Sequence, residues 1–131
     1  MTFSLELLSR LQAFVLQRAD TPMGTVQYRQ AGAPLAQVTH VLLHGIGSGS
    51  GSWLMQLEEA VRQTHRVGVL AWEAPGYGDS SPIRPWASVA SDYAARLWSW
   101  LDTLGVTQPI TLVGHSLGAL IAARSLPCRS A

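Results

Sequence analysis

Residues 110–118, Ile-Thr-Leu-Val-Gly-His-Ser-Leu-Gly, place a serine directly after an apolar run. The short uncharged stretch Ile110–Gly114 is typical of a buried strand. The apolar residues after Ser116 favour a helix. A Gly-x-Ser-x-Gly pattern between a strand and a helix predicts a sharp turn that exposes the serine hydroxyl. By itself the pattern is short enough to occur by chance, so its context decides its weight.

The predicted turn has a chemical consequence for Ser116. Glycines two residues before and after the serine are expected to leave space in a strained turn. The following helix would direct the Leu117 amide at a carbonyl under attack, because helix N-termini carry unpaired N–H groups. The pattern therefore predicts a serine nucleophile with one donor for an oxyanion.

Upstream of this turn, apolar runs alternate with amphipathic segments. Residues 14–20 fit either a continuation of the first helix or an extended segment, and residues 20–24 form a predicted turn. Alternating strands and helices predict an α/β fold with a mostly parallel sheet flanked by helices. The predicted strands span residues 25–32, 40–45, 66–72 and 110–114. The predicted helices span about 4–13, 53–61, 88–104 and 116–125, with Ser52 as the expected N-cap of the second and Pro127 expected to stop the last.

Composition excludes several function classes. The 131 residues suit one domain, and a net charge of +1 without a basic cluster argues against a nucleic-acid partner. Charged residues make up 13%, about half the usual ~25%, which indicates strands buried on both faces or surface left uncovered. The single cysteine, Cys128, allows no internal disulfide and no Cys/His metal site. Residues 1–14 lack a basic leader, and no apolar window is long enough for a membrane span, so we expect a cytoplasmic protein.

A second glycine-rich loop, residues 44–53, follows the predicted strand 40–45. It lacks the lysine of a phosphate-binding P-loop. The Gly-x-Gly-x-x-Gly dinucleotide pattern fails by one residue in either frame, at Ser50 or at Ser52. A flexible surface loop is one alternative. The other is that a neighbouring loop of a parallel sheet supplies the second oxyanion donor, from the amide of Ile46 or of Gly47.

Taken together, three segments resemble the α/β-hydrolase family: residues 44–47, 73–80 and 114–118, in the family's order. The resemblance covers roughly residues 24–125 and implies the mixed, mostly parallel sheet of that fold. Glu73 stands where the family usually has aspartate. The resemblance further implies a Ser116 nucleophile, an oxyanion hole from the Ile46 and Leu117 amides, and a surrounding loop and elbow made by His44, Gly45, Gly114, His115 and Gly118.

The sequence departs from the family's catalytic triad. The family order is serine, then an acid, then histidine, and no His, Asp or Glu follows Ser116. We therefore expect residues 1–131 to be a single domain truncated after the elbow helix. Within it, residues 1–23 form an amino-terminal helix and turn, and residues 24–125 form the matching core.

None of the four histidines is an obvious substitute for the missing base. His44 lies at the predicted mouth, where it normally shapes the oxyanion loop, with an improvised base as the alternative. His115 is expected to point away from the serine hydroxyl. His40 and His65 belong at the opposite edge of the sheet. Asp79 lies near the mouth and is expected to cap a turn or face solvent.

The leading hypothesis is a serine hydrolase that acts on a small ester or another acyl substrate, impaired or inactive as this chain. The alternative is a non-catalytic fragment that binds a small ligand or a partner. Neither hypothesis requires a cofactor or a metal. An uncovered sheet edge would favour self-association.

Overall fold

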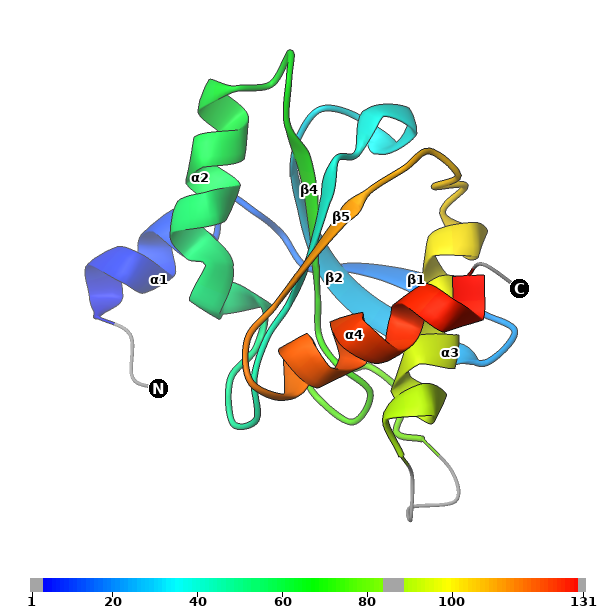
Figure 1. Ribbon diagram of the computed structural model, residues 1–131. Coiled ribbons are helices and arrows are strands. Elements are labelled where there is room, and N and C mark those ends of the chain that lie inside the picture. Colours follow the sequence, from blue (N-terminus) through cyan, green and yellow to red (C-terminus); the bar gives the residue numbers. More distant parts are fainter. Residues whose placement is uncertain (1–3, 84–88, 130–131) are drawn as a thin grey trace.

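The protein consists of a mixed β-sheet with helices on both faces (Figure 1). The structure is a computed structural model, and it describes residues 4–83 and 89–129. The α/β architecture predicted from the alternation of elements is confirmed. The strands are β1 (Gln17–Thr21), β2 (Gly24–Gly32), β3 (His40–Leu43), β4 (Gly68–Trp72) and β5 (Thr111–Gly114). The helices are α1 (Leu5–Leu11), α2 (Leu54–Arg62), α3 (Ala90–Thr103) and α4 (Leu117–Arg129), with 3₁₀ turns η1 (Leu35–Gln37) and η2 (Ser50–Trp53).

The order of the strands decides where the chain can build a site. Their order is β1-β2-β4-β3-β5. Strand β3 is parallel to both of its neighbours, β4 and β5, whereas β2 is antiparallel to β1 and β4. The crossover from β3 leads to β4 on one side of β3, and the next crossover, from β4 through α3, returns past β3 to β5 on its other side. The loops after β3 and β5 therefore lie next to each other at the carboxyl edge of the sheet. Open α/β sheets bind ligands at such a reversal of strand order.

Two apolar layers hold the helices against the sheet, and the alternation of side chains along each strand explains both. On β3, Val41 and Leu43 face the layer beneath α3 and α4, whereas Leu42 faces the layer beneath α1 and α2. Leu97 and Trp100 of α3 fill the first layer and are fully buried. Burial on both faces explains why the strands are apolar and why the charge content is low.

The structure settles one open alternative and corrects two predictions. Residues 17–21 are extended and pair with β2. Ser52 does not cap α2, because the residue belongs to η2 and Trp53 precedes the helix. The Ser52 hydroxyl instead donates to the Gly49 carbonyl at 2.8 Å. The prediction that Pro127 stops the last helix is wrong, since α4 continues to Arg129. A proline removes one backbone hydrogen bond, and this loss does not end the helix here.

Within residues 4–83 and 89–129, no helix is both long enough and apolar enough to cross a membrane. The same part of the chain holds no group of three His, Cys, Asp or Glu side chains that could bind a metal ion.

The predicted helix start at residue 88 lies outside the described residues. Helix α3 begins at Ala90, and the Asp92 carboxylate accepts from the Val89 amide at 3.0 Å.

Core packing on the α2 face gives a first prediction. Leu57 is fully buried in the layer between α2 and the sheet. Leu57→Ala should lower the free energy of unfolding by about 2–5 kcal/mol, from lost burial and the cavity that remains. Val61 lies on the same helix but is 53% exposed, so Val61→Ala should change it by less than about 0.5 kcal/mol. Urea unfolding followed by circular dichroism measures both, and equal losses would contradict this packing.

Candidate active site

Ser116 occupies a strained turn between β5 and α4. Its φ is 57°, and it is the one non-glycine residue with positive φ in the part of the chain that the structure describes. A serine in the left-handed region costs about 1–2 kcal/mol, so the surrounding structure must hold it there. The preceding residue, His115, donates its amide to the Leu43 carbonyl at 3.1 Å, and α4 begins at Leu117. The predicted strand–turn–helix arrangement is confirmed, with Ser116 exposed at its tip.

The glycines of the motif are required by backbone contacts. A Cβ on Gly114 would lie 2.3 Å from the Gly118 carbonyl carbon, and a Cβ on Gly118 would lie 2.0 Å from the Leu43 oxygen. These distances are too short for any side chain. The sequence predicted that the glycines clear space for the serine, whereas the structure shows that they let α4 approach the ends of β5 and β3.

The loop after β3 lies directly against this elbow. A Cβ on Gly45 would lie 3.1 Å from the Ser116 Cβ and 2.9 Å from His115 Nδ1. The loop then forms a tight turn, in which the Ser48 amide donates to the Gly45 carbonyl at 3.2 Å. Gly47 has a φ of 75°, as the third residue of such a turn often requires. The structure thus brings together the two segments that the sequence analysis paired.

Two backbone amides near Ser116 remain available as donors. The Gly47 amide is used, because it donates to the Tyr77 hydroxyl at 3.0 Å. Of the two amides considered in this loop, the Gly47 amide is therefore already hydrogen-bonded, whereas the Ile46 amide is not bonded to any described residue. At the start of α4, the Gly118 amide donates to the His115 carbonyl at 2.9 Å. Among the described residues, the amides of Ile46 and Leu117 have no hydrogen-bond acceptor.

His44 is locked inside the protein and is not placed as a base. The Ala74 amide donates to its Nε2 at 3.0 Å, and its Nδ1 lies 2.8 Å from the Gly45 carbonyl. A backbone amide can only donate, so Nε2 carries the lone pair and Nδ1 carries the proton. The ring is 1% exposed. His44 therefore shapes the loop, and the alternative of an improvised base requires breaking its contact with Ala74.

The other three histidines do not contact the serine hydroxyl. His115 is exposed, with its ring beside Gly45. His40 begins β3 at the opposite edge of the sheet, where its Nδ1 lies 2.7 Å from the Thr39 hydroxyl. His65 is exposed in the turn after α2. Within the described residues, no hydrogen bond joins a histidine to Ser116.

The segment after β4 contributes contacts that the sequence analysis did not predict. Glu73 is 9% exposed and accepts a hydrogen bond from the Ser50 amide at 3.0 Å. Tyr77 packs edge-on against the His44 ring, with 4.8 Å between ring centroids. The only available signal was the family motif itself, which does not say what these side chains contact. Asp79 is exposed and its amide donates to the Gln27 side chain at 2.9 Å, which agrees with the expected structural role.

A sequence model described as "Alpha/beta hydrolase family" matches residues 41–131. The chain belongs to the alpha/beta hydrolase family. Among curated relatives, (E)-2-((N-methylformamido)methylene)succinate hydrolase of Acinetobacter baylyi is 32% identical over 81 residues, 62% of this chain and 29% of that protein. A protein of Enterobacter cloacae named "Putative carbamate hydrolase RutD" is 34% identical over 90 residues, 69% of this chain and 31% of that protein. The chain thus spans less than a third of the length of these relatives.

Solved structures of other alpha/beta hydrolases superpose on most of the chain. Epoxide hydrolase VrEH1 from Vigna radiata aligns with a TM-score of 0.78 over 92% of this chain and 37% of that one, at 20% identity, which supports the fold alone. Epoxide hydrolase A from Mycobacterium thermoresistibile aligns with a TM-score of 0.73 at 26% identity, over 86% of this chain and 34% of that one. The predicted fold family is therefore confirmed.

The strained backbone of Ser116 gives a second prediction. Ser116→Gly should raise the free energy of unfolding by about 0.5–1 kcal/mol, because glycine adopts positive φ without the Cβ clash but has a more flexible unfolded state. Ser116→Ala keeps the Cβ and should change it by less than about 0.5 kcal/mol. Denaturant unfolding of the three proteins measures the difference. A glycine variant less stable than the alanine variant would contradict the assigned φ.

The close approach of Gly118 to Leu43 gives a third prediction. Gly118→Ala should destabilise the chain by at least about 2 kcal/mol, because the new methyl group meets backbone atoms that cannot move independently. Ala119→Gly, at an exposed neighbouring position of α4, is the matched control and should cost about 1 kcal/mol from helix propensity. If Gly118→Ala is tolerated as well as the control, α4 does not pack on β3 as described.

Proposed function

We propose that this alpha/beta hydrolase uses Ser116 as the nucleophile in acyl transfer to water, on a small ester or another small acyl substrate. The observation that carries the proposal is the exposed Ser116 held at positive φ, between β5 and the N-terminus of α4 and against the loop after β3. A strained, exposed serine in a turn of this kind is characteristic of the position of a nucleophile in this fold.

The expected reaction follows from the groups around the serine. The Ser116 hydroxyl attacks the substrate carbonyl, its proton passes to a base, and the carbonyl oxygen becomes an oxyanion. The free amides of Ile46 and Leu117 are proposed to donate to that oxygen, each stabilising the transition state. The alcohol or amine then leaves with a proton, and water hydrolyses the acyl-serine ester to release the acid and restore Ser116.

The substrate class rests on chemistry shared with the relatives. Their names describe hydrolases of (E)-2-((N-methylformamido)methylene)succinate and of a carbamate, and both compounds contain an acyl carbon that a serine can attack. We extend only this shared acyl chemistry to the present chain, since it spans less than a third of those proteins.

Ser116 has no histidine partner within the described residues, so this chain is proposed to hydrolyse substrates slowly on its own. Loss of the base from a serine–histidine system removes several orders of magnitude of rate and leaves mainly the oxyanion contribution. We expect the chain to hydrolyse p-nitrophenyl acetate at nearly the rate of its Ser116→Ala variant. A large Ser116-dependent rate would show that a group within this chain, or within a second copy, acts as the base.

Covalent labelling tests the nucleophile separately from turnover. With imidazole added as an external base, a fluorophosphonate should modify Ser116 selectively, as located by mass spectrometry of proteolytic peptides. Without imidazole, the labelling should be much slower, because no base within the described residues takes the Ser116 proton. The matched control is Ser125, which is buried on α4 and donates to the Ile121 carbonyl at 2.6 Å; it should stay unmodified. Labelling spread evenly over the exposed serines, or unchanged in Ser116→Ala, would contradict the proposal.

A further inference from the structure

The segment that follows β4, residues 73–81, is folded on itself into a compact unit that we call the support segment. Within it, the Tyr77 amide donates to the Ala74 carbonyl at 2.8 Å, and the Ser80 amide donates to the Tyr77 carbonyl at 2.9 Å. The Gly76 amide closes the loop on the Ser80 carbonyl at 3.2 Å. These bonds satisfy backbone groups inside the segment and limit its freedom.

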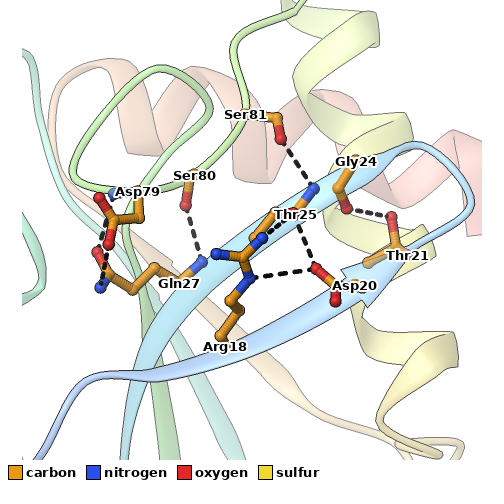
Figure 2. Close-up of polar contacts among 9 residues, drawn as sticks. All are labelled: Arg18, Asp20, Thr21, Gly24, Thr25, Gln27, Asp79, Ser80 and Ser81. Atoms are coloured by element: carbon orange, nitrogen blue, oxygen red, sulfur yellow. Dashed lines mark hydrogen bonds and ion pairs between the residues drawn. The ribbon is translucent and has the colours of Figure 1, made fainter.

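The far end of the support segment is fastened to strand β2, as Figure 2 shows. The Ser80 hydroxyl accepts from the Gln27 amide at 2.9 Å, and the Ser81 hydroxyl accepts from the Thr25 amide at 3.0 Å. The Ser80 hydroxyl also donates to the Glu73 carbonyl at 2.6 Å. The support segment is thus anchored to the sheet at a point away from Ser116.

The near end of the support segment holds the loop after β3 on both sides of Ile46. Before Ile46, the Ala74 amide binds His44 Nε2 at 3.0 Å. After it, the Tyr77 hydroxyl accepts from the Gly47 amide at 3.0 Å, and the Glu73 carboxylate accepts from the amide and the hydroxyl of Ser50. A loop of alternating glycine and serine has little rigidity of its own, so these contacts fix its course.

Burial and charge make the Glu73 contact a strong one. Ser50 is fully buried, and its hydroxyl also accepts from Arg29 Nε at 3.0 Å. Burial lowers the pKa of the Arg29 guanidinium, and the nearby Glu73 carboxylate opposes this shift. Hydrogen bonds to ionised groups in such surroundings are stronger than neutral ones. Ser50 is therefore held between β2 and the end of β4.

From these contacts we propose that Glu73 and Tyr77 are positioning residues for the oxyanion hole: the support segment fixes the Ile46 amide in its orientation toward Ser116. Tyr77 also occupies the Gly47 amide, the other donor of this loop, and so selects which amide faces the substrate. This inference rests on the proposed function, in which the Ile46 amide stabilises the oxyanion. Neither side chain touches the reacting atoms.

Hydrogen exchange tests the holding of the loop without relying on activity. In Tyr77→Phe, which keeps the ring beside His44, the Gly47 amide should exchange about fivefold to tenfold faster, as expected for the loss of one hydrogen bond. In Glu73→Leu, which removes the acceptor of the Ser50 amide, the Ser50 amide should exchange faster by a similar factor. The matched control is Tyr93→Phe on α3, which should leave both amides unchanged. Unchanged exchange in both test variants would overturn the proposal, whatever the reactivity of Ser116.

Phosphonylation kinetics test whether the held amide matters for reaction at Ser116. With imidazole supplied as the base, the maximal rate of fluorophosphonate labelling should fall about tenfold in Tyr77→Phe, because the amide acts on the oxyanion that forms only in the transition state. The fluorophosphonate concentration for half-maximal rate and the melting temperature should stay close to wild type. Faster exchange with an unchanged maximal rate would overturn the positioning role and leave Ser116 as nucleophile. An unlabelled wild-type Ser116 would refute the proposed function, and exchange alone would then decide whether the support segment holds the loop.

Discussion

The contact between the first turn of α4 and the end of β3 is the constraint on which the rest of the site depends. The Gly118 backbone lies so close to the Leu43 carbonyl that only glycine fits. This approach forces the chain to turn within His115 and Ser116, and Ser116 absorbs the turn by taking a positive φ of 57°. Packing of α4 on the sheet offsets the free-energy cost of this strain, since Ile121 of α4 is fully buried in the apolar layer against the sheet.

The order of the strands places a second loop next to the strained turn at Ser116. Because β4 and β5 flank β3, the loop after β3 emerges next to the elbow and puts Gly45 in contact with Ser116. The glycine-rich loop would be loose by itself, and the segment after β4 holds it through His44, Gly47 and Ser50. Three adjacent strands therefore each contribute one loop to the site. The loop after β5 carries the Ser116 hydroxyl, the loop after β3 carries the free Ile46 amide, and the segment after β4 holds the loop after β3 in place.

Sequence reasoning predicted the fold because the elements that define it are periodic and local. The apolar runs at β3, β4 and β5, and the stripe on α3, each follow from burial on one face or on two. The glycines at 114 and 118 predicted the elbow because the Gly-x-Ser-x-Gly pattern is local, although what requires Gly118 is its tertiary contact with the Leu43 carbonyl. Whether residues 14–20 are helical or extended remained open, since the polar segment within them, residues 17–21 as the structure bounds it, is held extended by its pairing with β2. The roles of Glu73 and Tyr77 were equally hidden, because their partners lie 23 and 30 residues away along the chain.

In the proposed mechanism, Ser116 attacks an acyl carbon whose oxygen accepts hydrogen bonds from two backbone amides. The decisive measurement is a crystal structure of the chain after reaction with a fluorophosphonate in the presence of imidazole, since the tetrahedral phosphorus mimics the intermediate. This mechanism predicts a phosphonyl group on Ser116 Oγ with one oxygen about 2.7–3.1 Å from both the Ile46 and the Leu117 amide nitrogens. A phosphonyl oxygen that faces only solvent, or that is bound by the Gly47 amide in place of Ile46, would contradict it.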